Sequence, residues 1–475
     1  LHLSIRRQRQ MCIRDRVVLC KKKRNYSKLI TRRKNTLMDN PRKNLTQLFV
    51  PIALETLCYM LAGIIDTLML SSVGDSAVGA VGTANTYIGI FIIMFNIVCS
   101  GMIAVMTQYI GANQPGIAYQ ARQLGLLFNA IIGIVLSGLL LFYSGSVLTL
   151  VGVAPKLLDY AGTYLTIVGG SCILNALIPI FASYLRAFGH SKEPLIATLC
   201  ANVLNFILNA VFLFVMDWGV AGVAAATVIS RIMNLVIVIC LSHFLVHAKQ
   251  SPERQKNSLV LRQIVRVGLP SACETALYNI AMTLTIRFLN QMDADGVNVT
   301  ARSYAAQITN FSYCVGAALA QANAIMTGWR IGAKEYEACD KGTKKAAIIG
   351  VITAAILETI FALASGTLMH LFTDDPAMIS LVGKLLVIDI ALETGRVTNL
   401  VYGQALKTSG DAIFPTIIGA IFMYLCMVGG TYFFGIHLGL LVVGAYIGMA
   451  SAECVRAVCM YLRWKSGKWK SKGFL

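Results

Sequence analysis

An aspartate stands inside a long apolar run near the start of the sequence. Asp66 lies in LETLCYMLAGIIDTLML, residues 54–70, and its immediate neighbours are uncharged. A charged aspartate at the centre of a lipid bilayer costs at least about 2.5–3.5 kcal/mol. We therefore expect Asp66 to be neutralised there, either by a bound cation or by a proton.

Acidic residues recur in other apolar stretches. Glu55 and Glu274 stand in two of them, and Asp389 and Glu393 lie about one helical turn apart in a third. Each of these carboxylates is a candidate for binding a positively charged ligand or for neutralising a neighbouring site. Ion pairing is the alternative, most directly for Glu393, because Arg396 follows it at the i,i+3 spacing that brings two side chains together on a helix.

The elements that carry these residues are long enough to cross a membrane. The chain has 475 residues, of which 56% are hydrophobic and only 13% are charged, whereas soluble domains average about 25% charged residues. The apolar residues form twelve stretches of about 20 residues or more, separated by short polar joints. The sequence therefore predicts an all-α membrane protein with twelve transmembrane helices.

The distribution of positive charge predicts the orientation in the membrane. Most of the net charge of +19 comes from residues 1–43, which hold fifteen Lys or Arg residues and two acidic ones. The other basic residues gather on alternate joints and at the C-terminal end, and the positive-inside rule places such segments in the cytoplasm. We expect a multi-pass protein of the plasma membrane (the inner membrane of a bacterium) with both termini cytoplasmic, in contact with lipid and without a nucleic-acid partner.

The two halves of the chain repeat each other. Residues 51–59, PIALETLCY, align with residues 270–278, PSACETALY, at an offset of 219. Residues 185–194, LRAFGHSKEP, align with residues 406–415, LKTSGDAIFP, at an offset of 221. An offset of six spans preserves the direction of each helix, so the repeats are parallel. Parallel repeats are typical of membrane transporters in which two lobes surround a central cavity.

This duplication predicts the domain organisation. We expect two six-helix lobes at residues 44–246 and 262–464, joined by a cytoplasmic linker at residues 247–261. Basic cytoplasmic tails are expected at residues 1–43 and 465–475. The segment RRQRQMCIRDR near the start looks like translated sequencing-adapter DNA, so a start at Met38, with residues 1–37 not native, is the alternative for the first tail.

The sequence lacks the motifs of an enzyme or an ATP-driven pump. It contains no G-x-x-x-x-G-K-S/T loop for nucleotide phosphates, no HExxH and no GxSxG. Its thirteen cysteines include no CxxC pair, so neither a zinc site nor a disulfide framework is predicted. We expect a protein that is not an enzyme and that needs no cofactor.

Several motifs together resemble the multidrug and toxic compound extrusion (MATE) family of secondary transporters. They include GIIDTLMLSSVG, TQYIGA, LRAFGHSKEP, NVLNFILN and LETGRVTNLVYGQALKTSGDAIFP, in this order along the chain. The resemblance implies antiport by alternating access, in which Na⁺ or H⁺ enters while an organic, often cationic and amphipathic compound leaves. It also implies that the protein works as a monomer and needs no cofactor besides the coupling ion, Na⁺ or H⁺.

The resemblance further implies a cation site in the N-terminal lobe, made by Asp66, Asn205, Asn209 and Thr227. Independently, Asn205 and Asn209 are four residues apart, so their amides share one helix face. Carboxylate, amide and hydroxyl oxygens suit a hard cation such as Na⁺, and a buried aspartate can take a proton instead. If sodium is the coupling ion, its ligands would be Asp66, Asn205 and Asn209. Interhelical hydrogen bonds are the alternative role for the two amides.

The second half of the chain has lost the corresponding donors. At offsets of 219–221 the partners of Asp66, Asn205 and Asn209 are Thr285, Cys426 and Gly430. The two lobes are therefore chemically unequal, which favours a specialised N-terminal cation site.

The acidic residues suggest the charge of the substrate. We take Glu274, Glu55, Asp389 and Glu393 as candidate substrate-binding residues and expect small organic cations as substrates. The alternative is a flippase for a lipid-linked precursor of the same superfamily, which would need a cavity rich in Arg or Lys. The first and seventh helices carry Glu55, Asp66 and Glu274, with Arg287 as the main exception, and this favours a cationic substrate.

Overall fold

The structure is a computed structural model that describes residues 43–475, except for 151–152, 154, 249–250 and 293–294. The described residues form helices joined by short turns, and no strand occurs among them. The helices of the N-terminal half are α2 (Leu45–Leu70), α3 (Asp75–Gly111), α4 (Pro115–Leu150), α5 (Pro155–Tyr164) with η1 (Leu165–Gly169) and α6 (Cys172–Ala187), α7 (Lys192–Ala210) with η2 (Val211–Val215), and α8 (Gly219–Leu245).

The C-terminal half repeats this order. Its helices are α9 (Asn257–Met292), α10 (Val297–Gly332), α11 (Tyr336–Leu363), α12 (Ser365–Met369), α13 (Pro376–Thr408), α14 (Ile413–Phe422) with η4 (Met423–Val428) and η5 (Thr431–His437), α15 (Leu441–Lys465) and η6 (Lys468–Ser471). α9 begins at Asn257, inside the segment predicted as the linker. The predicted first tail lies outside the described residues except for Lys43, which donates to the Gly189 carbonyl oxygen.

The long helices have the length and composition of membrane spans. Seven of those described are apolar enough to cross a membrane, and two bent helix pairs bring the number to nine. The three other long helices, α9, α10 and α13, are interrupted by polar residues such as Glu274, Arg302 and Asp389. Polar residues inside a membrane bundle face other helices or a cavity rather than lipid. The all-α fold with twelve long membrane-spanning segments in two lobes is thus confirmed.

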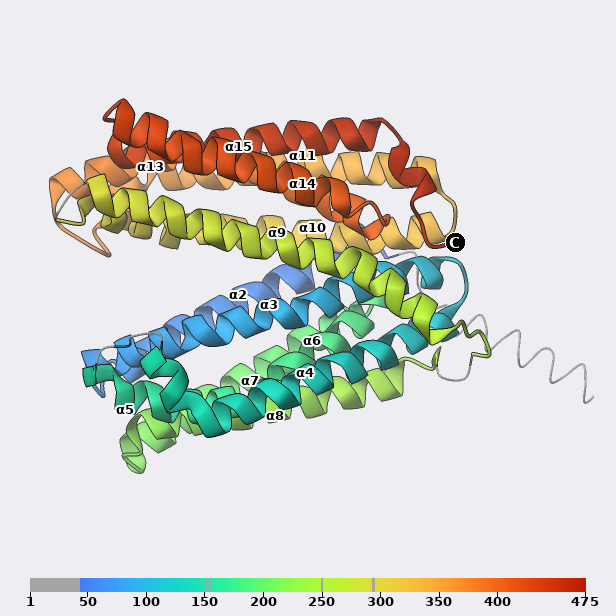
Figure 1. Ribbon diagram of the computed structural model, residues 1–475, viewed down its shortest axis with the longest axis horizontal. Coiled ribbons are helices and arrows are strands. Elements are labelled where there is room, and N and C mark those ends of the chain that lie inside the picture. Colours follow the sequence, from blue (N-terminus) through green and yellow to red (C-terminus); the bar gives the residue numbers. More distant parts are fainter. Residues whose placement is uncertain (1–42, 151–152, 154, 249–250, 293–294) are drawn as a thin grey trace, which may run out of the picture.

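The two lobes form a V (Figure 1). The N-terminal bundle, blue to green, and the C-terminal bundle, yellow to red, diverge at one end of the molecule and converge at the other, where the C-terminus lies. We call these the open end and the linker end. The lobes contact each other mainly through α2 and α3 of the first lobe and α9 and α10 of the second.

The linker end is closed by helices that approach very closely. A side chain at Gly101 of α3 would overlap the Ile264 backbone of α9, and one at Gly268 of α9 would overlap the Ile97 backbone of α3. Glycine permits this approach because it has no Cβ. The two backbones therefore touch only because both helices carry glycine at the crossing.

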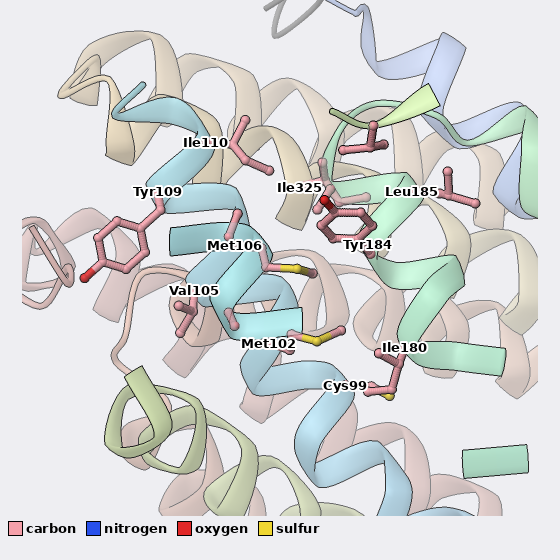
Figure 2. Packing of buried hydrophobic residues seen from close by; sticks show 14 of the residues in the cluster. Cys99, Met102, Val105, Met106, Tyr109, Ile110, Ile180, Tyr184, Leu185 and Ile325 are labelled. Atoms are coloured by element: carbon pink, nitrogen blue, oxygen red, sulfur yellow. The ribbon is translucent and has the colours of Figure 1, made fainter. Parts of the chain in front are cut away.

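A hydrophobic core covers this crossing. Figure 2 shows Met102 and Met106 of α3 beside Tyr184 of α6 and Ile325 of α10, with Tyr109 on the other side of α3. All five are buried in one cluster that draws on both lobes. Burial of such side chains contributes about 25 cal/mol for each Å² removed from water. The cluster therefore stabilises the lobes in their joined arrangement at the linker end.

Hydrogen bonds add to this closure. The Gln108 side chain of α3 donates to the Thr408 carbonyl oxygen (2.6 Å) and accepts from the Phe474 backbone N–H (2.9 Å). The Trp329 indole of α10 donates to the Ala187 carbonyl oxygen of α6 (2.8 Å). Two of these bonds join one lobe to the other, and the third joins α3 to the segment that follows the second lobe, so they oppose opening of the linker end.

Candidate ion-binding and substrate-binding sites

The N-terminal lobe brings three of the predicted cation ligands together. Asn209 Nδ2 of α7 donates to Asp66 Oδ1 of α2 at 2.7 Å and to Asn205 Oδ1 at 3.3 Å. Asn209 and Asn205 are one turn apart on α7, and both are buried. Asn209 Oδ1 is also buried and has no hydrogen-bond partner among the described residues. In this cluster the free amide oxygen of Asn209 therefore lies on the side chain that contacts the Asp66 carboxylate.

Thr227 lies on the neighbouring helix α8. It is buried, and its hydroxyl donates to the Val223 carbonyl oxygen one turn earlier (2.9 Å). No direct bond joins it to Asp66 in the part of the chain that is described. The hydroxyl oxygen keeps its lone pairs as acceptors, so Thr227 could still contribute one oxygen to an ion at this site.

Sequence reasoning missed a basic residue beside this cluster. Arg231 of α8 lies close enough to Asp66 for its charge to act on the carboxylate, and its Nη1 is buried without a hydrogen-bond partner among the described residues. Its position one turn after Thr227, on the same face of α8, was the signal in the sequence. A cation bound at Asp66 would therefore compete with the positive charge of Arg231 for electrostatic attraction to the carboxylate.

A sodium ion here would depend on amide and hydroxyl oxygens for most of its ligands. Within the described ranges no group of three or more His, Cys, Asp or Glu side chains is placed to hold a metal. A single carboxylate with neutral oxygens around it suits a monovalent cation or a proton better than a divalent metal.

An ion pair occurs twice, once in each lobe. Glu55 of α2 pairs with Arg186 of α6 at 2.6 Å, and Glu274 of α9 pairs with Lys407 of α13 at 2.8 Å. The four residues occupy matching positions of the sequence repeat. Arg186 and Lys407 both lie in the last turn of their helices, where the helix dipole favours a cation. Both predicted carboxylates therefore already have basic partners.

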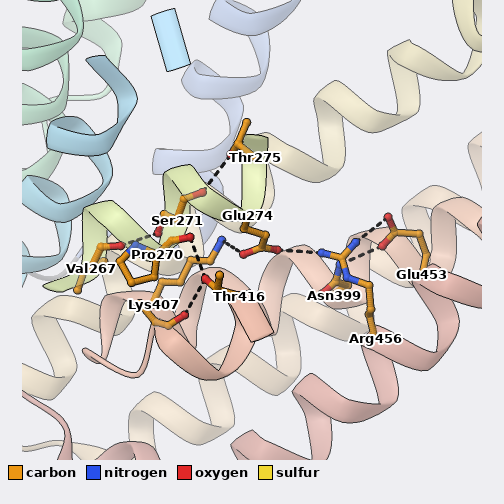
Figure 3. Close-up of polar contacts among 11 residues, drawn as sticks. Val267, Pro270, Ser271, Glu274, Thr275, Asn399, Lys407, Thr416, Glu453 and Arg456 are labelled. Carbon is orange, nitrogen blue, oxygen red and sulfur yellow. Dashed lines mark hydrogen bonds and ion pairs between the residues drawn. The ribbon is translucent and has the colours of Figure 1, made fainter. Parts of the chain in front are cut away.

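The pair in the C-terminal lobe extends into a network (Figure 3). Glu274 also binds Arg456 of α15 at 2.8 Å, and Arg456 binds Glu453 at 3.2 Å. Glu453 lies 3.9 Å from Arg396 of α13, which pairs in turn with Glu393. The ion pair between Glu393 and Arg396 that the spacing offered as an alternative is therefore confirmed.

Neighbouring side chains hold this network in place. Asn399 of α13 donates to Glu453 Oε2 (2.9 Å), and Thr416 of α14 donates to the Pro270 carbonyl oxygen of α9 (2.8 Å) one turn before Glu274 (Figure 3). The network thus joins α9, α13 and α15. Sequence reasoning missed Lys407, because it considered only pairs within one helix.

The network borders a cavity of about 450 Å³ inside the C-terminal lobe. Asp389 lines this cavity, and so do Arg302 of α10 and the aromatic side chains Tyr278, Tyr313 and Tyr446. A second cavity of about 480 Å³ lies between the lobes, and its charged lining residues are Arg186 and Lys407. The two cavities share several lining residues, Lys407 and Tyr313 among them, so they adjoin. Basic residues from helices other than the first and seventh therefore contribute to both cavities.

A carboxylate near this cavity forms no ion pair with any described residue. Glu358 of α11 is completely buried, and neither of its oxygens has a hydrogen-bond partner among the described residues. It lies within electrostatic reach of Asp389 and Glu393. Its position in the apolar helix α11 was the only signal in the sequence.

Known proteins share this architecture. The chain matches the MatE family over residues 51–211 and 270–433. It is 31% identical to the "Uncharacterized transporter YisQ" of Bacillus subtilis, over 93% of this chain and 98% of that protein. It is 24% identical to the "Probable multidrug resistance protein NorM" of Thermotoga maritima, over 91% and 94%. Its fold matches the "Crystal structure of MATE in the bent conformation" with a TM-score of 0.83 at 19% identity, over 92% of this chain and 98% of that one.

Proposed function

Because the chain belongs to the MATE family, we propose that it is a secondary active multidrug efflux antiporter that exchanges Na⁺ or H⁺ for amphipathic organic compounds. The observation that carries the proposal is the cluster in which the buried Asn209 contacts both the half-buried Asp66 and the buried Asn205. A charged carboxylate in a membrane-spanning helix has a high free energy, and a reversibly bound cation or proton lowers it.

The coupling follows from this cost. With Asp66 charged and unoccupied, closing water out of the N-terminal lobe would leave a carboxylate that Arg231 compensates only in part and without a hydrogen-bonded ion pair. A cation or proton on Asp66 lowers the free energy of the closed lobe, and Asn209 Oδ1 is available as a further ligand for Na⁺. Release of the ion on the other side of the membrane then restores the first state, so ion entry drives the conformational cycle.

The arrangement of the lobes supports alternating access. The linker end is sealed by the crossing of α3 and α9, whereas the lobes diverge at the open end. We place the linker end in the cytoplasm, in line with the positive-inside rule, so that this conformation faces outward. The protein would act as a monomer in the bacterial inner membrane, with both termini cytoplasmic.

The organic-cation prediction rests on fewer carboxylates than the sequence suggested. Glu55 and Glu274 have basic partners, and Glu393 pairs with Arg396. Asp389 lines the cavity and forms no ion pair with any described residue, so it is the carboxylate that supports binding of a positively charged group.

A flippase for a lipid-linked precursor is the second candidate function. It is favoured by the basic residues Arg186 and Lys407, which line the cavity between the lobes. Both are neutralised by carboxylates, however, so the cavity offers no excess positive charge to an anionic headgroup. The antiporter is therefore the better-supported proposal.

The test is transport in proteoliposomes with an imposed Na⁺ or pH gradient, using ethidium and the zwitterionic dye tetramethylrhodamine as cargo. We expect gradient-driven export of at least one dye, reduced to background by Asp66→Asn, and the effective gradient identifies the coupling ion. Asp217→Asn is the matched control, because Asp217 is exposed and its positive φ of 52° suits asparagine. If wild type moves neither dye under either gradient, the antiporter proposal fails and the flippase takes its place.

A further inference from the structure

The chain continues past its last membrane span and folds back onto the linker end. α15 ends at Lys465, and residues 466–475 include the short helix η6. Figure 1 shows this segment running from the C-terminal bundle toward the N-terminal bundle. We propose that residues 466–475 form a latch, which is anchored on the C-terminal lobe, binds α3 of the N-terminal lobe and stabilises the closed linker end. The inference rests on the proposed transport cycle, in which this end opens.

Two tryptophans anchor the segment on the C-terminal lobe. Trp464 near the end of α15 and Trp469 of η6 are each 1% exposed, and their rings stack with centroids 4.2 Å apart. The Trp469 indole donates to the Trp464 carbonyl oxygen (3.0 Å), and the Trp464 indole donates to Asp340 Oδ1 of α11 (2.9 Å). Gly467 turns the chain between them with a φ of 71°, which glycine adopts without strain. The start of the latch therefore belongs to the C-terminal lobe.

After this anchor the chain crosses the turn between α13 and α14. A side chain at Gly410 of that turn would overlap the Lys472 carbonyl oxygen, so the two backbones touch. The next residue, Gly473, lies between the lobes. A Cβ atom on Gly473 would be 3.3 Å from Gln108 Oε1 of α3 and 3.5 Å from Ile331 Cγ2 of α10. The segment thus reaches the junction of the two lobes.

The tip of the latch binds the N-terminal lobe through Phe474. Its backbone N–H donates to Gln108 Oε1 of α3 at 2.9 Å. Its side chain packs against a small buried cluster that draws on α3, α9 and the start of α14, namely Ala104, Val267 and Ala412. An aromatic ring contributes a large apolar area to such a contact. The tip therefore combines a directed hydrogen bond with apolar packing on both lobes.

The tip binds at a point where the lobes are in backbone contact. A side chain at Gly332 of α10 would overlap the Gln108 carbonyl oxygen, so α3 and α10 touch at the residue that the latch holds. Only four residues separate Trp469 from Phe474, and each residue of an extended chain spans at most about 3.3–3.6 Å. Opening of the linker end moves α3 away from α10. The tip must then leave α3, because its anchor stays on the other lobe.

The latch biases the conformational equilibrium because its tip contacts both lobes in one conformation only. A contact that exists in one of two states shifts the population toward that state. The tether makes docking of the tip an intramolecular event, which raises its effective concentration at α3. The latch therefore favours the closed linker end, and the coupling ion and the substrate act against this bias during the cycle.

The test measures the distance between the lobes at the linker end. Spin labels attached through Gln123→Cys of α4 and Lys345→Cys of α11, two exposed positions, report this distance by double electron–electron resonance. The measurement uses the full chain with its native cysteines replaced by serine or alanine. Phe474→Ala removes the ring and keeps the N–H, whereas Phe474→Pro removes both. We expect Phe474→Pro to raise the ratio of open to closed linker ends at least about tenfold, which corresponds to about 1.4 kcal/mol, and Phe474→Ala to raise it less.

Two further variants separate the latch from general effects on the tail. Leu475→Ala is the matched control, because Leu475 is the adjacent residue and is 51% exposed. It should leave the ratio unchanged. Trp469→Ala removes the anchor, so the tip no longer ties α3 to the C-terminal lobe, and the ratio should rise as in Phe474→Pro. The closed-state distance, which each variant should keep as one of its two populations, shows that the variant is folded.

Two results would overturn the inference. They are an unchanged ratio in Phe474→Pro, which would mean that residues 466–475 only cover the C-terminal lobe, and a rise in Leu475→Ala as large as in Phe474→Pro. The distances are measured without cargo or gradient, so they are independent of transport. A shifted ratio together with absent gradient-driven export would refute the antiporter alone, whereas export together with an unchanged ratio would refute the latch alone.

Discussion

The ion pairs Glu55–Arg186 and Glu274–Lys407 occupy matching positions in the two lobes, but the charged residues around them differ. Among the described residues, Arg186 is the only ion-pair partner of Glu55 in the N-terminal lobe, whereas Glu274 in the C-terminal lobe has two, Lys407 and Arg456. The pair joins the first and fourth spans of each lobe. The duplication thus kept a contact that holds the lobe together and changed the groups around it.

The lobes diverge most in their unpaired carboxylates. In the N-terminal lobe Asp66 contacts an amide, whereas its repeat partner in the C-terminal lobe is Thr285, whose hydroxyl donates to the Ala281 carbonyl oxygen (3.0 Å) of its own helix. In the C-terminal lobe the carboxylate that lines the cavity and forms no ion pair with a described residue is instead Asp389. This difference supports ion binding in one lobe and substrate binding in the other.

A further position carries opposite charges in the two lobes. Gly222 packs against Phe212, and Gly444 packs against Phe434, so these contacts correspond at an offset of 222. The same offset relates Arg231 to Glu453. The arginine acts on Asp66 in one lobe, and the glutamate belongs to the ion-pair network in the other.

Loss of the basic partner should affect the two ion pairs unequally. Arg186→Met leaves Glu55 without an ion-pair partner, and we expect a loss of about 3–5 kcal/mol in stability. Lys407→Met should cost less, because Arg456 still binds Glu274 at 2.8 Å. Thermal unfolding of the purified variants in detergent measures both effects. Equal losses would show that the extra partner of Glu274 does not stabilise it.

The corresponding glycines should differ in the same way on a smaller scale. A side chain at Gly444 would fall on backbone atoms of Phe434 and Gly435, whereas one at Gly222 would meet the Cβ atoms of Phe212 and Trp218. We expect Gly444→Ala to lower stability by about 1–3 kcal/mol. Gly222→Ala should lower it less, because the new methyl would meet its nearest neighbour at 2.8 Å there but at 2.4 Å at Gly444. A greater loss in Gly222→Ala by thermal unfolding would contradict this ranking.

The smallest effect is expected at the charge-reversed position. Arg231→Gln removes a positive charge that acts on Asp66, so the coupling ion should bind more tightly. Half-maximal stimulation of efflux should then need a several-fold lower concentration of Na⁺ or H⁺, a change of about 1 kcal/mol. Arg287→Gln serves as the control that changes charge elsewhere. A requirement for more ion in Arg231→Gln would mean that Arg231 helps to build the site.

The sequence was sufficient for those features that depend on local pattern. Apolar stretches predicted the twelve spans, because a bilayer requires helices of that length and polarity. The repeat of PIALETLCY in PSACETALY predicted two lobes with one plan. The four-residue spacing of Asn205 and Asn209 placed both amides on one face, and the structure brings that face to Asp66.

Only the tertiary structure decided which charges remain free. Glu55 and Glu274 looked available in the sequence, but their partners Arg186 and Lys407 come from helices more than a hundred residues away. The rotation of each helix about its axis determines such pairings, and this rotation results from packing against several neighbours at once. For the same reason the sequence alone could not show that Asp389, one of its candidates, forms no ion pair with a described residue, or that Arg302 lines the same cavity.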